Sequence, residues 1–343
     1  MRHWLSVREF EPAELAALVR LARRFKAGGA DRDAAVLRGR ILGMVFFNPS
    51  LRTRTSFEAA MLRYGGHAIC LSVGGDTWKL EYRDGAVMNG DAAEHIREAA
   101  PALSRYCDVL AVRTFAALKS AAEDAADPVL RSFARFATVP VINMESASEH
   151  PCQGLADWMT MDEKLGGASG RHFVLTWAPH VKPLPLAVPH SAVLAAAAAG
   201  MHVTIAHPPG YELDAAVLDC AVSWCAAAGA RLTVVRDQRG ATTQADVLYA
   251  KSWGSTSFYG NPEAQRADFA RYADWMIGKG HLGPRTHLMH CLPVRRNVEV
   301  ADDALDGPQS VVVDQAENRL WAQAAILSYL LLPSTTRGRT TQT

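Results

Sequence analysis

The 343-residue sequence lacks the features that mark several special classes of protein. It has no apolar run long enough to span a bilayer, and its start, MRHWLSVREFEPAEL, has neither the apolar core nor the small-residue cleavage site of a signal peptide. The six cysteines show no paired metal-binding spacing. We therefore expect a protein of the reducing cytoplasm, without membrane segments and without a metal site.

The chain also lacks an excess of charge of one sign, because 36 basic side chains stand against 35 acidic ones. This balance and the absence of a basic tract argue against a nucleic-acid partner, although a local positive pocket can still hold a small anion. No Gly-x-Gly-x-x-Gly follows a strand-like segment, which disfavours a nucleotide-binding dehydrogenase. What remains is a globular chain, 49% hydrophobic and long enough for two domains.

Apolar runs alternate with helical patterns along the chain, which predicts an α/β fold with parallel sheets flanked by helices. The first series of strand-like segments comprises 40–47, 67–73, 107–113 and 139–144. The second comprises 172–179, 202–208, 231–236, 246–250 and 286–293, with 310–315 extending it. Helical patterns occur at 57–64, 192–199 and 215–228 and in a closing helix near 316–332.

The break between the two series falls near residue 150 and predicts the domain organisation. We expect a first domain over 1–149, a second over 150–315 and a separate closing helix over 316–332. The remaining stretch, PSTTRGRTTQT (333–343), has the composition of a disordered tail.

The stretch FFNPSLRTRTSFE (46–58) places Arg52 and Arg54 in the expected first turn of a helix. That end of a helix carries partial positive charge and unpaired N–H groups, so cations there are unfavourable unless an anion binds. The hydroxyl of Ser50, the helix N–H groups and the guanidinium groups together predict a phosphate cradle. The alternative is an arginine-rich surface turn in which Ser50 is simply the N-cap.

Polar residues follow other predicted strands as well, and this recurrence favours the cradle. Arg113 ends one strand, Glu145 and His-Pro-Cys-Gln (150–153) follow the next, and His-Cys-Leu-Pro (290–293) follows a late one. Open α/β sheets bind ligands beyond the carboxyl ends of their strands, so we expect these residues to meet.

These motifs, in this order and over nearly the whole chain, resemble the transcarbamylase family. Its members transfer a carbamoyl group from carbamoyl phosphate to an amine. The resemblance implies a carbamoyl-phosphate domain and an amino-acid domain, with the C-terminal helix returning to the first domain. It also implies a homotrimer with active sites between subunits, acting on small molecules.

Carbamoyl phosphate presents a dianionic phosphate that must leave and a carbonyl oxygen that becomes an oxyanion when an uncharged amine attacks. Arginine forks suit phosphate oxygens, and no metal, nucleotide or redox cofactor is needed. The expected catalytic residues are Arg52, Thr53, His150, Gln153 and Cys291. With the residues carried over by resemblance, the carbamoyl-phosphate-binding set is Ser50, Leu51, Arg52, Thr53, Trp78, Arg113, His150, Gln153, Cys291, Leu292 and Arg319.

His150 and the nearby Cys152 each have a simpler structural explanation when taken alone. His150 can be a hydrogen-bonded structural histidine, and the neighbouring Cys152 is interpreted as a small core residue.

The stretch YAKSWGS (249–255) bears on which amine is carbamoylated. Ornithine transcarbamylases hold the free α-ammonium with Asp and Ser-Met-Gly, whereas Lys251 here would repel it and attract a carboxylate. The pattern resembles the N-acylornithine transcarbamylases. Trp78 in DTWKLE resembles the tryptophan that those enzymes insert into a neighbouring subunit's site, and Arg295 in HCLPVRRN resembles their carboxylate-binding arginine. Taken alone, Trp78 is partly buried packing and Lys251 a solvated charge. The expected acylornithine-binding residues are Glu145, His180, Lys182, Lys251, Leu292 and Arg295.

The acyl group depends on GDAAEHI, in which Ala93 lies two residues before the histidine. Acetylornithine enzymes of this branch have glutamate there and succinylornithine enzymes have proline. Glutamate would repel a succinyl carboxylate and Ala93 does not, while His180 and Lys182 are available to bind one. Glu299 is a further departure, since some acetyl-type relatives carry lysine there. The sequence favours succinyl over acetyl and leaves a non-catalytic anion-binding relative as the remaining alternative.

Overall fold

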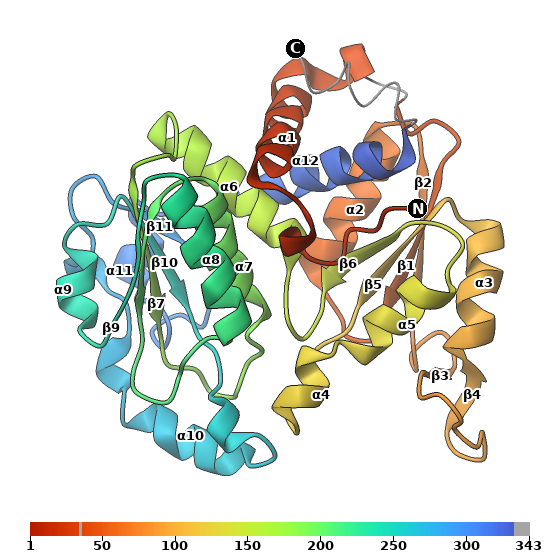
Figure 1. Ribbon diagram of the computed structural model, residues 1–343. Helices are drawn as coiled ribbons and strands as arrows, with labels where there is room; N and C mark the ends of the chain where they lie inside the picture. Colours follow the sequence, from red (N-terminus) through yellow and green to blue (C-terminus); the bar gives the residue numbers. More distant parts are fainter. Residues whose placement is uncertain (34–35, 333–343) are drawn as a thin grey trace.

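The computed structural model describes residues 1–33 and 36–332, which form two parallel sheets flanked by helices (Figure 1). This arrangement confirms the predicted α/β fold. The tail expected at 333–343 lies outside the described residues. No helix in the described part of the chain is both long and apolar enough to cross a membrane.

The first sheet has the strand order β2-β1-β5-β6, and every neighbouring pair is parallel. Its strands are β1 (Ile41–Phe46), β2 (His67–Ser72), β5 (Val109–Arg113) and β6 (Val141–Glu145). Side chains alternate between two faces, so Leu42 and Met44 enter one core cluster while Val45 enters another. The helices of this half are α1 (Pro12–Asp33), α2 (Leu51–Arg63), α3 (Ile96–Tyr106), α4 (Ala121–Ala125) and α5 (Pro128–Phe136).

The second sheet has the order β11-β10-β7-β8-β9 and is also parallel throughout. Its strands are β7 (His172–Trp177), β8 (His202–Ala206), β9 (Leu232–Val235), β10 (Val247–Lys251) and β11 (His287–Met289). The helices of this half are α7 (Ala187–Ala198), α8 (Ala215–Ala227), α9 (Gln238–Thr242), α10 (Pro262–Ala270) and α11 (Asp302–Leu305). Short 3₁₀ turns occur in both halves. The first half has η1 (Val7–Glu9), and the second has η2 (Thr256–Phe258), η3 (Ala273–Trp275) and η4 (Lys279–His281).

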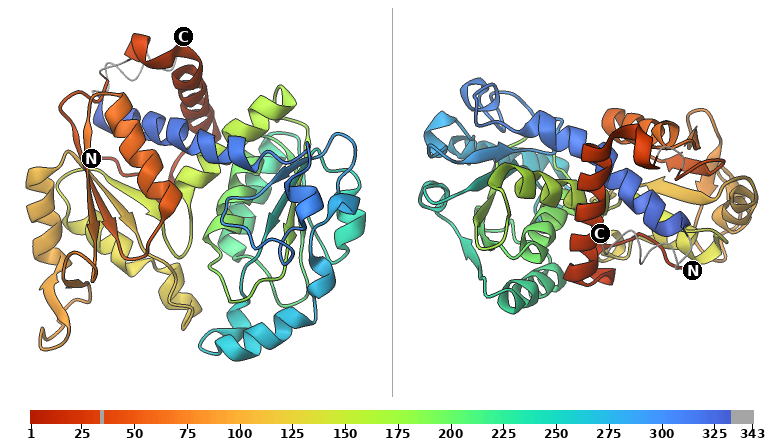
Figure 2. Two further views of the ribbon diagram at one scale, coloured as in Figure 1. Left: turned by 180° about the vertical axis from the view of Figure 1, so that it is seen from behind. Right: turned by 90° about the horizontal axis from the view of Figure 1, so that it is seen from above.

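Two long helices join the halves. Helix α6 (Pro151–Leu165) leaves the first sheet after β6, and its residues from Pro151 to Met161 are all buried. Helix α12 (Val312–Leu331) follows the second sheet and packs on α1, α2 and α6, so it returns to the first half (Figure 2). Residues from both sheets and both helices therefore belong to one continuous hydrophobic cluster.

The prediction that 310–315 extends the strand series is wrong. Ser310 makes a single isolated bridge to Leu288, and α12 begins two residues later at Val312. Buried positions at Val312, Gln315 and Arg319 recur at a spacing of three to four, which is the helical period. The three consecutive valines raised the strand propensity locally, but this helical burial pattern decided the structure.

A small two-stranded unit projects from the first half on the side away from the second sheet (Figure 1). It consists of β3 (Lys79–Glu81) and β4 (Ala92–His95), which pair in parallel with a register shift after Lys79. Trp78 lies directly before β3, and Ala93 lies on β4. The sequence pattern does not predict this unit, although both residues are expected to have functional roles.

The packing of α12 predicts a stability difference between two of its apolar residues. Ile326 is fully buried, whereas Val313 on the same helix is 75% exposed. Ile326→Ala should lower the free energy of unfolding by about 3 kcal/mol, because a buried cavity is created, and Val313→Ala should change it by less than about 0.5 kcal/mol. Urea unfolding followed by circular dichroism measures both values, and equal effects would contradict the described position of α12.

Candidate active site

A pocket of about 530 Å³ lies between the two halves, at the carboxyl ends of strands from both sheets. Segments that follow β1, β5, β6, β7, β10 and β11 all contribute to its wall, together with α12. The sequence-predicted residues that line it are Ser50, Leu51, Arg52, Thr53, Arg113, Glu145, His150, Gln153, His180, Lys182, Lys251, Cys291, Leu292, Arg295 and Arg319. The expected meeting of polar strand ends is thus observed.

The start of α2 separates the two arginines that prompted the cradle hypothesis. Ser50 is the N-cap and accepts a hydrogen bond from the Thr53 N–H at 3.2 Å, and no acidic residue lies in the first turn. Arg54 points outward and forms an ion pair with Glu58 at 3.0 Å. Arg52 is half-buried in the pocket wall, where burial lowers the pKa of its guanidinium. The N-cap is therefore observed, and it does not conflict with the predicted phosphate cradle, because Arg52 still faces the pocket.

Two arginines from distant parts of the chain meet at the Thr53 hydroxyl, and Arg52 lines the same pocket. Arg319 donates from Nη2 to Thr53 Oγ1 at 3.0 Å, and Arg113 donates to the same oxygen at 3.5 Å. Arg113 also forms a buried ion pair with Glu145. One carboxylate thus faces the guanidinium groups of Arg52, Arg113 and Arg319, and this excess of positive charge suits a dianion such as phosphate.

His150 lies beside this cluster and is almost fully buried. Its Nε2 is 3.6 Å from the nearer carboxylate oxygen of Glu145, and its Nδ1 has no hydrogen-bond partner among the described residues. Burial and the adjacent arginines Arg319 and Arg113 hold the pKa of His150 well below its usual value. The imidazole is therefore neutral at physiological pH and can donate one hydrogen bond to a developing oxyanion.

Gln153 is held by a buried network beneath the pocket. Its amide nitrogen donates to Asp157 Oδ1 at 2.7 Å, and its oxygen accepts from Arg319 at 2.7 Å. Gln315 donates to the same Asp157 oxygen at 2.7 Å. Burial raises the pKa of Asp157 to about 7, and these contacts fix which end of the Gln153 amide faces Arg319.

The segment after β11 supplies a thiol and a strained residue. Burial raises the pKa of Cys291 to about 11, so it enters the pocket as a neutral thiol. Leu292 adopts a φ of 54°, the left-handed region that leucine rarely occupies. Such strain is retained only where surrounding structure enforces it, and it is commonly found at binding sites.

Lys251 has a buried counter-ion that the sequence analysis did not assign to it. Its Nζ lies 3.9 Å from Glu299, and the same carboxylate oxygen is 3.4 Å from His290 Nε2. Burial alone would raise the pKa of Glu299, but the facing Lys251 and His290 bring it down to about 2. Lys251 therefore presents less net positive charge to a ligand than a bare lysine would.

Two other cations at the pocket are exposed and have no ion-pair partner among the described residues. They are Lys182 and Arg295. Within the described part of the chain, Arg295 contacts an acid only through its backbone N–H, which donates to Glu299 at 2.8 Å. His180 lies next to Lys182 and accepts from its N–H at 3.1 Å. The pocket can thus bind carboxylates at a position distinct from the arginine cluster.

Trp78 and Ala93 do not line the pocket of their own chain. Trp78 is 59% exposed, and its indole N–H donates to Glu94 at 2.7 Å, which ties the tryptophan to the strand that carries Ala93. Ala93 is exposed as well. Neither residue can contact a ligand in this pocket within one subunit.

Sequence reasoning missed the supporting residues Asp157, Gln315 and Phe115, the last of which packs its ring 4.5 Å from the Arg113 guanidinium carbon. Asp157 was detectable, because it lies four residues after Gln153 and so on the same helix face. Cys152 agrees with its interpretation as a core residue, since it is fully buried and burial raises its pKa to about 12.

Comparison with known proteins supports the same interpretation of the chain. The family model described as aspartate/ornithine carbamoyltransferase, carbamoyl-P binding domain, matches residues 2–163. The model of the corresponding Asp/Orn binding domain matches residues 187–330.

Two curated relatives belong to the N-acylornithine branch. The chain is 41% identical over 336 residues to the N-acetylornithine carbamoyltransferase of Xanthomonas campestris pv. campestris, covering 96% of this chain and 98% of that protein. It is 38% identical over 296 residues to the N-succinylornithine carbamoyltransferase of Bacteroides fragilis, covering 86% of this chain and 88% of that protein.

A solved structure is similar to this protein over nearly the whole chain. It is an N-acetyl-L-ornithine transcarbamylase mutant, with alanine in place of a glutamate, complexed with carbamyl phosphate and N-succinyl-L-norvaline. The TM-score is 0.92 at 42% identity, covering 96% of this chain and all of that one. With both domain models matched and relatives similar over nearly its full length, the chain belongs to the aspartate/ornithine carbamoyltransferase family.

Proposed function

We propose that this carbamoyltransferase transfers the carbamoyl group of carbamoyl phosphate to the side-chain amine of an N-acylated L-ornithine, a step of arginine biosynthesis. The observation that carries the proposal is the division of the pocket into an arginine cluster and a separate group of cations. The relatives named for N-acetylornithine and N-succinylornithine support the same substrate class.

The phosphate half of the reaction belongs to the arginine cluster. In this proposal Arg52, Arg113 and Arg319 hold the dianion, while Ser50, Thr53 and the α2 N–H groups face its oxygens. As the amine attacks, the carbonyl oxygen becomes negative and receives the N–H of neutral His150. The C–O bond to phosphate then breaks, the attacking nitrogen gives one proton to the departing phosphate, and hydrogen phosphate leaves as a dianion whose charge the arginines already balance.

The amine half belongs to the opposite wall. The α-carboxylate of the substrate is bound by Arg295 and Lys251, and Glu145 and Leu292 face the side-chain amine. An acylated α-nitrogen carries no charge, so the cations around it do not oppose binding. A free α-ammonium would face these cations without a dedicated acidic partner, because Glu299 is already engaged with Lys251 and His290.

We favour the N-succinyl substrate over the N-acetyl one. Succinylation adds a second carboxylate, and Lys182 and Arg295 give the pocket two cations without acidic partners among the described residues. The solved relative in which alanine replaces a glutamate binds N-succinyl-L-norvaline, a succinylated ligand, and Ala93 stands where acetyl-type relatives carry glutamate.

Ala93 and Trp78 reach an active site only in an assembly, so we further propose a homotrimer with shared sites. The β3–β4 unit carries Ala93 and begins directly after Trp78, and it projects from the first half on the side away from the second sheet (Figure 1). In this arrangement the unit closes the acyl end of a neighbouring subunit's pocket.

Arg52 and Arg54 provide a matched pair that tests the cradle. Arg52→Ala should lower kcat/KM for carbamoyl phosphate by about 10³-fold, because a charge-stabilising donor is lost from the reacting end. Arg54 lies in the same helical turn, but its side chain pairs with Glu58 outside the pocket. The Arg54→Ala variant should therefore retain near-normal activity. Phosphate release measures both, and near-normal turnover of the Arg52 variant would overturn the assignment.

The acyl preference is tested with carbamoyl phosphate and three amines: ornithine, N-acetylornithine and N-succinylornithine. We expect kcat/KM to be highest for the succinyl substrate and lowest for ornithine. Ala93→Glu should lower the ratio of kcat/KM for N-succinylornithine to kcat/KM for N-acetylornithine by roughly ten-fold or more and so reverse the preference. The reason is that a like-charge contact in a partly desolvated site costs on the order of 1–3 kcal/mol.

Ala93→Gln is the control for the acyl test, because it adds nearly the same volume without charge. It should reduce activity with both acylated substrates and leave their ratio close to that of the wild type. A wild-type preference for N-acetylornithine, or equal ratios in the glutamate and glutamine variants, would show that the succinyl choice is wrong.

Shared active sites predict recovery of activity from two inactive chains. Arg52→Ala and Trp78→Ala chains, mixed under conditions of subunit exchange, should regain part of the wild-type activity, because some sites then receive neither defect. Each variant taken alone through the same exchange is the control. Proven exchange without any recovery would place Trp78 outside the active site.

A further inference from the structure

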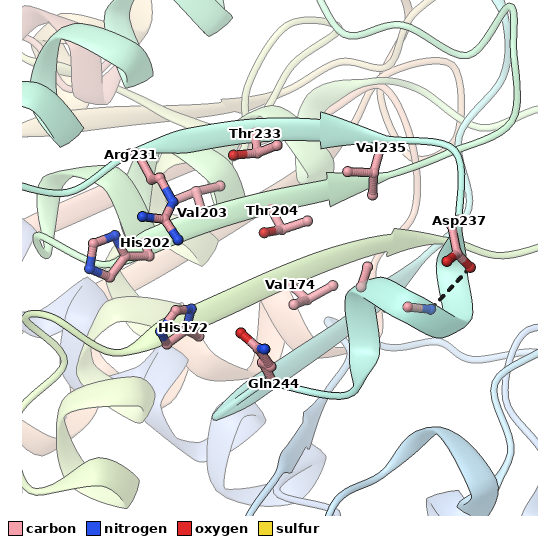
Figure 3. Close-up of a pocket in the computed structure, with 12 residues that line it drawn as sticks. His172, Val174, His202, Val203, Thr204, Arg231, Thr233, Val235, Asp237 and Gln244 are labelled. Carbon is pink, nitrogen blue, oxygen red and sulfur yellow. Dashed lines mark hydrogen bonds between the residues drawn. The ribbon is translucent and has the colours of Figure 1, made fainter.

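A second groove, with a volume of about 350 Å³, lies on one face of the second sheet (Figure 3). Strands β7, β8 and β9 form its floor, and α9 with the residue Gln244 forms one side. Apolar side chains cover the same face over β10 and β11, whereas Thr233 on β9 is exposed. The groove is thus an uncovered part of the sheet face and is separate from the interdomain pocket.

The register of the strands places three basic side chains in one row across this floor. His172 on β7 pairs with His202 on β8. Thr204 on β8 pairs with Thr233 on β9, and counting two residues back along each strand brings His202 opposite Arg231. Because side chains alternate and neighbouring strands lie about 4.8 Å apart, His172, His202 and Arg231 stand side by side on the same face. Figure 3 shows all three at the same end of the groove.

This row has little internal compensation of charge. The two imidazole rings stack with centroids 5.1 Å apart, and the buried Nδ1 of His202 has no hydrogen-bond partner in the described part of the chain. Arg231 is exposed, and no acidic side chain pairs with it among residues 1–33 and 36–332. Burial, His172 and Arg231 all lower the pKa of His202, as expected where basic groups lie together without an anion.

Two carboxylates lie near the ends of the groove, and neither closes off the row. Asp246 accepts the backbone N–H of His172 at 2.8 Å, on the side of His172 away from Arg231. Asp237 lies at the opposite end, where it caps α9 by accepting the Gly240 N–H at 3.0 Å (Figure 3). The His202–Arg231 end of the row therefore retains unpaired donors.

We propose that this row is a second ligand site, which binds a small molecule through a phosphate or carboxylate group. The guanidinium fork of Arg231 and the ring N–H groups of the two imidazoles that line the groove suit the oxygens of such a group. The groove volume falls within the range of about 300–1,000 Å³ that is usual for small-molecule sites.

The remainder of the groove indicates what the rest of the ligand is like. Beyond the basic row lie the hydroxyls of Thr204 and Thr233, the amide of Gln244 and the methyl groups of Val174 and Val235. These side chains suit a short body that is partly polar. The row lies at the amino ends of β7 and β8, whereas His180 and Lys251 of the active site follow the carboxyl ends of β7 and β10, so the ligand does not share the active-site pocket.

Histidine-ring NMR on the full-length protein tests the site with two probes, inorganic phosphate and succinate. The signals of His172 and His202 are assigned from the variants His172→Gln and His202→Gln, and the signal of His150 separately reports occupation of the active site. We expect a saturable shift of the His172 and His202 signals at millimolar probe, and none with potassium chloride at equal ionic strength. A response to phosphate alone or to succinate alone identifies which oxyanion group the site takes.

Arg231→Ala supplies the decisive comparison, since its exposed side chain makes no ion pair among the described residues. It should weaken probe binding by about ten-fold, as expected for one lost charge-assisted contact, and leave carbamoyltransferase activity unchanged. Arg239→Ala, which removes an exposed arginine from α9 outside the groove lining, should keep wild-type affinity. No saturable shift of His172 and His202, or an equal affinity in the Arg231 and Arg239 variants, would overturn the proposal.

Discussion

The gathering of three guanidinium groups in one pocket, two of them at the Thr53 hydroxyl, is the constraint on which the rest of the site depends. Arg52 comes from the first turn of α2, Arg113 from the end of β5 and Arg319 from the middle of α12. Like charges at this distance repel one another, so the structure must hold them by other means. It does so with Glu145, with the Thr53 hydroxyl and with the buried Gln153, and a net positive charge remains on this side of the pocket.

Burial, together with the same excess of charge, sets the state of the neighbouring groups. Burial, reinforced by the adjacent arginines, holds the pKa of His150 well below its usual value, and burial raises the pKa of the Cys291 thiol to about 11, so both groups are uncharged. On the opposite wall the buried Glu299 offsets Lys251. Lys182 and Arg295 are exposed at the pocket and have no acidic side-chain partner within residues 1–33 and 36–332. The pocket thus differs in charge from one wall to the other, and this difference orients two substrates relative to each other.

The sequence predicted the fold where local patterns and packing agree. The strand at 40–47 and the helix start at Arg52 follow from an apolar run and a capping serine, and both are observed. The segment 310–315 shows the limit, because three valines favour a strand locally while burial against α1, α2 and α6 selects a helix. Periodicity also gave no sign of β3 and β4, which are short and half-exposed.

Residues that line the pocket were accessible to sequence reasoning because they occur in motifs at strand ends. Their supports were harder to find. Glu299 and Gln315 act through contacts with residues far away or on other elements, and no spacing in the sequence reveals the partners that give such groups their roles. The buried Lys251–Glu299 pair is an example, since the lysine taken alone indicates a full positive charge and the structure shows a compensated one.

The position of Arg319 in the last helix has a consequence for how the protein comes into being. The phosphate cradle is built on the first sheet, yet one of its three arginines is translated only after every strand of both sheets. During synthesis the first half can fold around β1 and α2, but its anion site stays incomplete until α12 emerges and packs back. A partly made chain therefore lacks one of the three guanidinium groups of the arginine cluster, and the pocket wall is complete only once the final helix has docked.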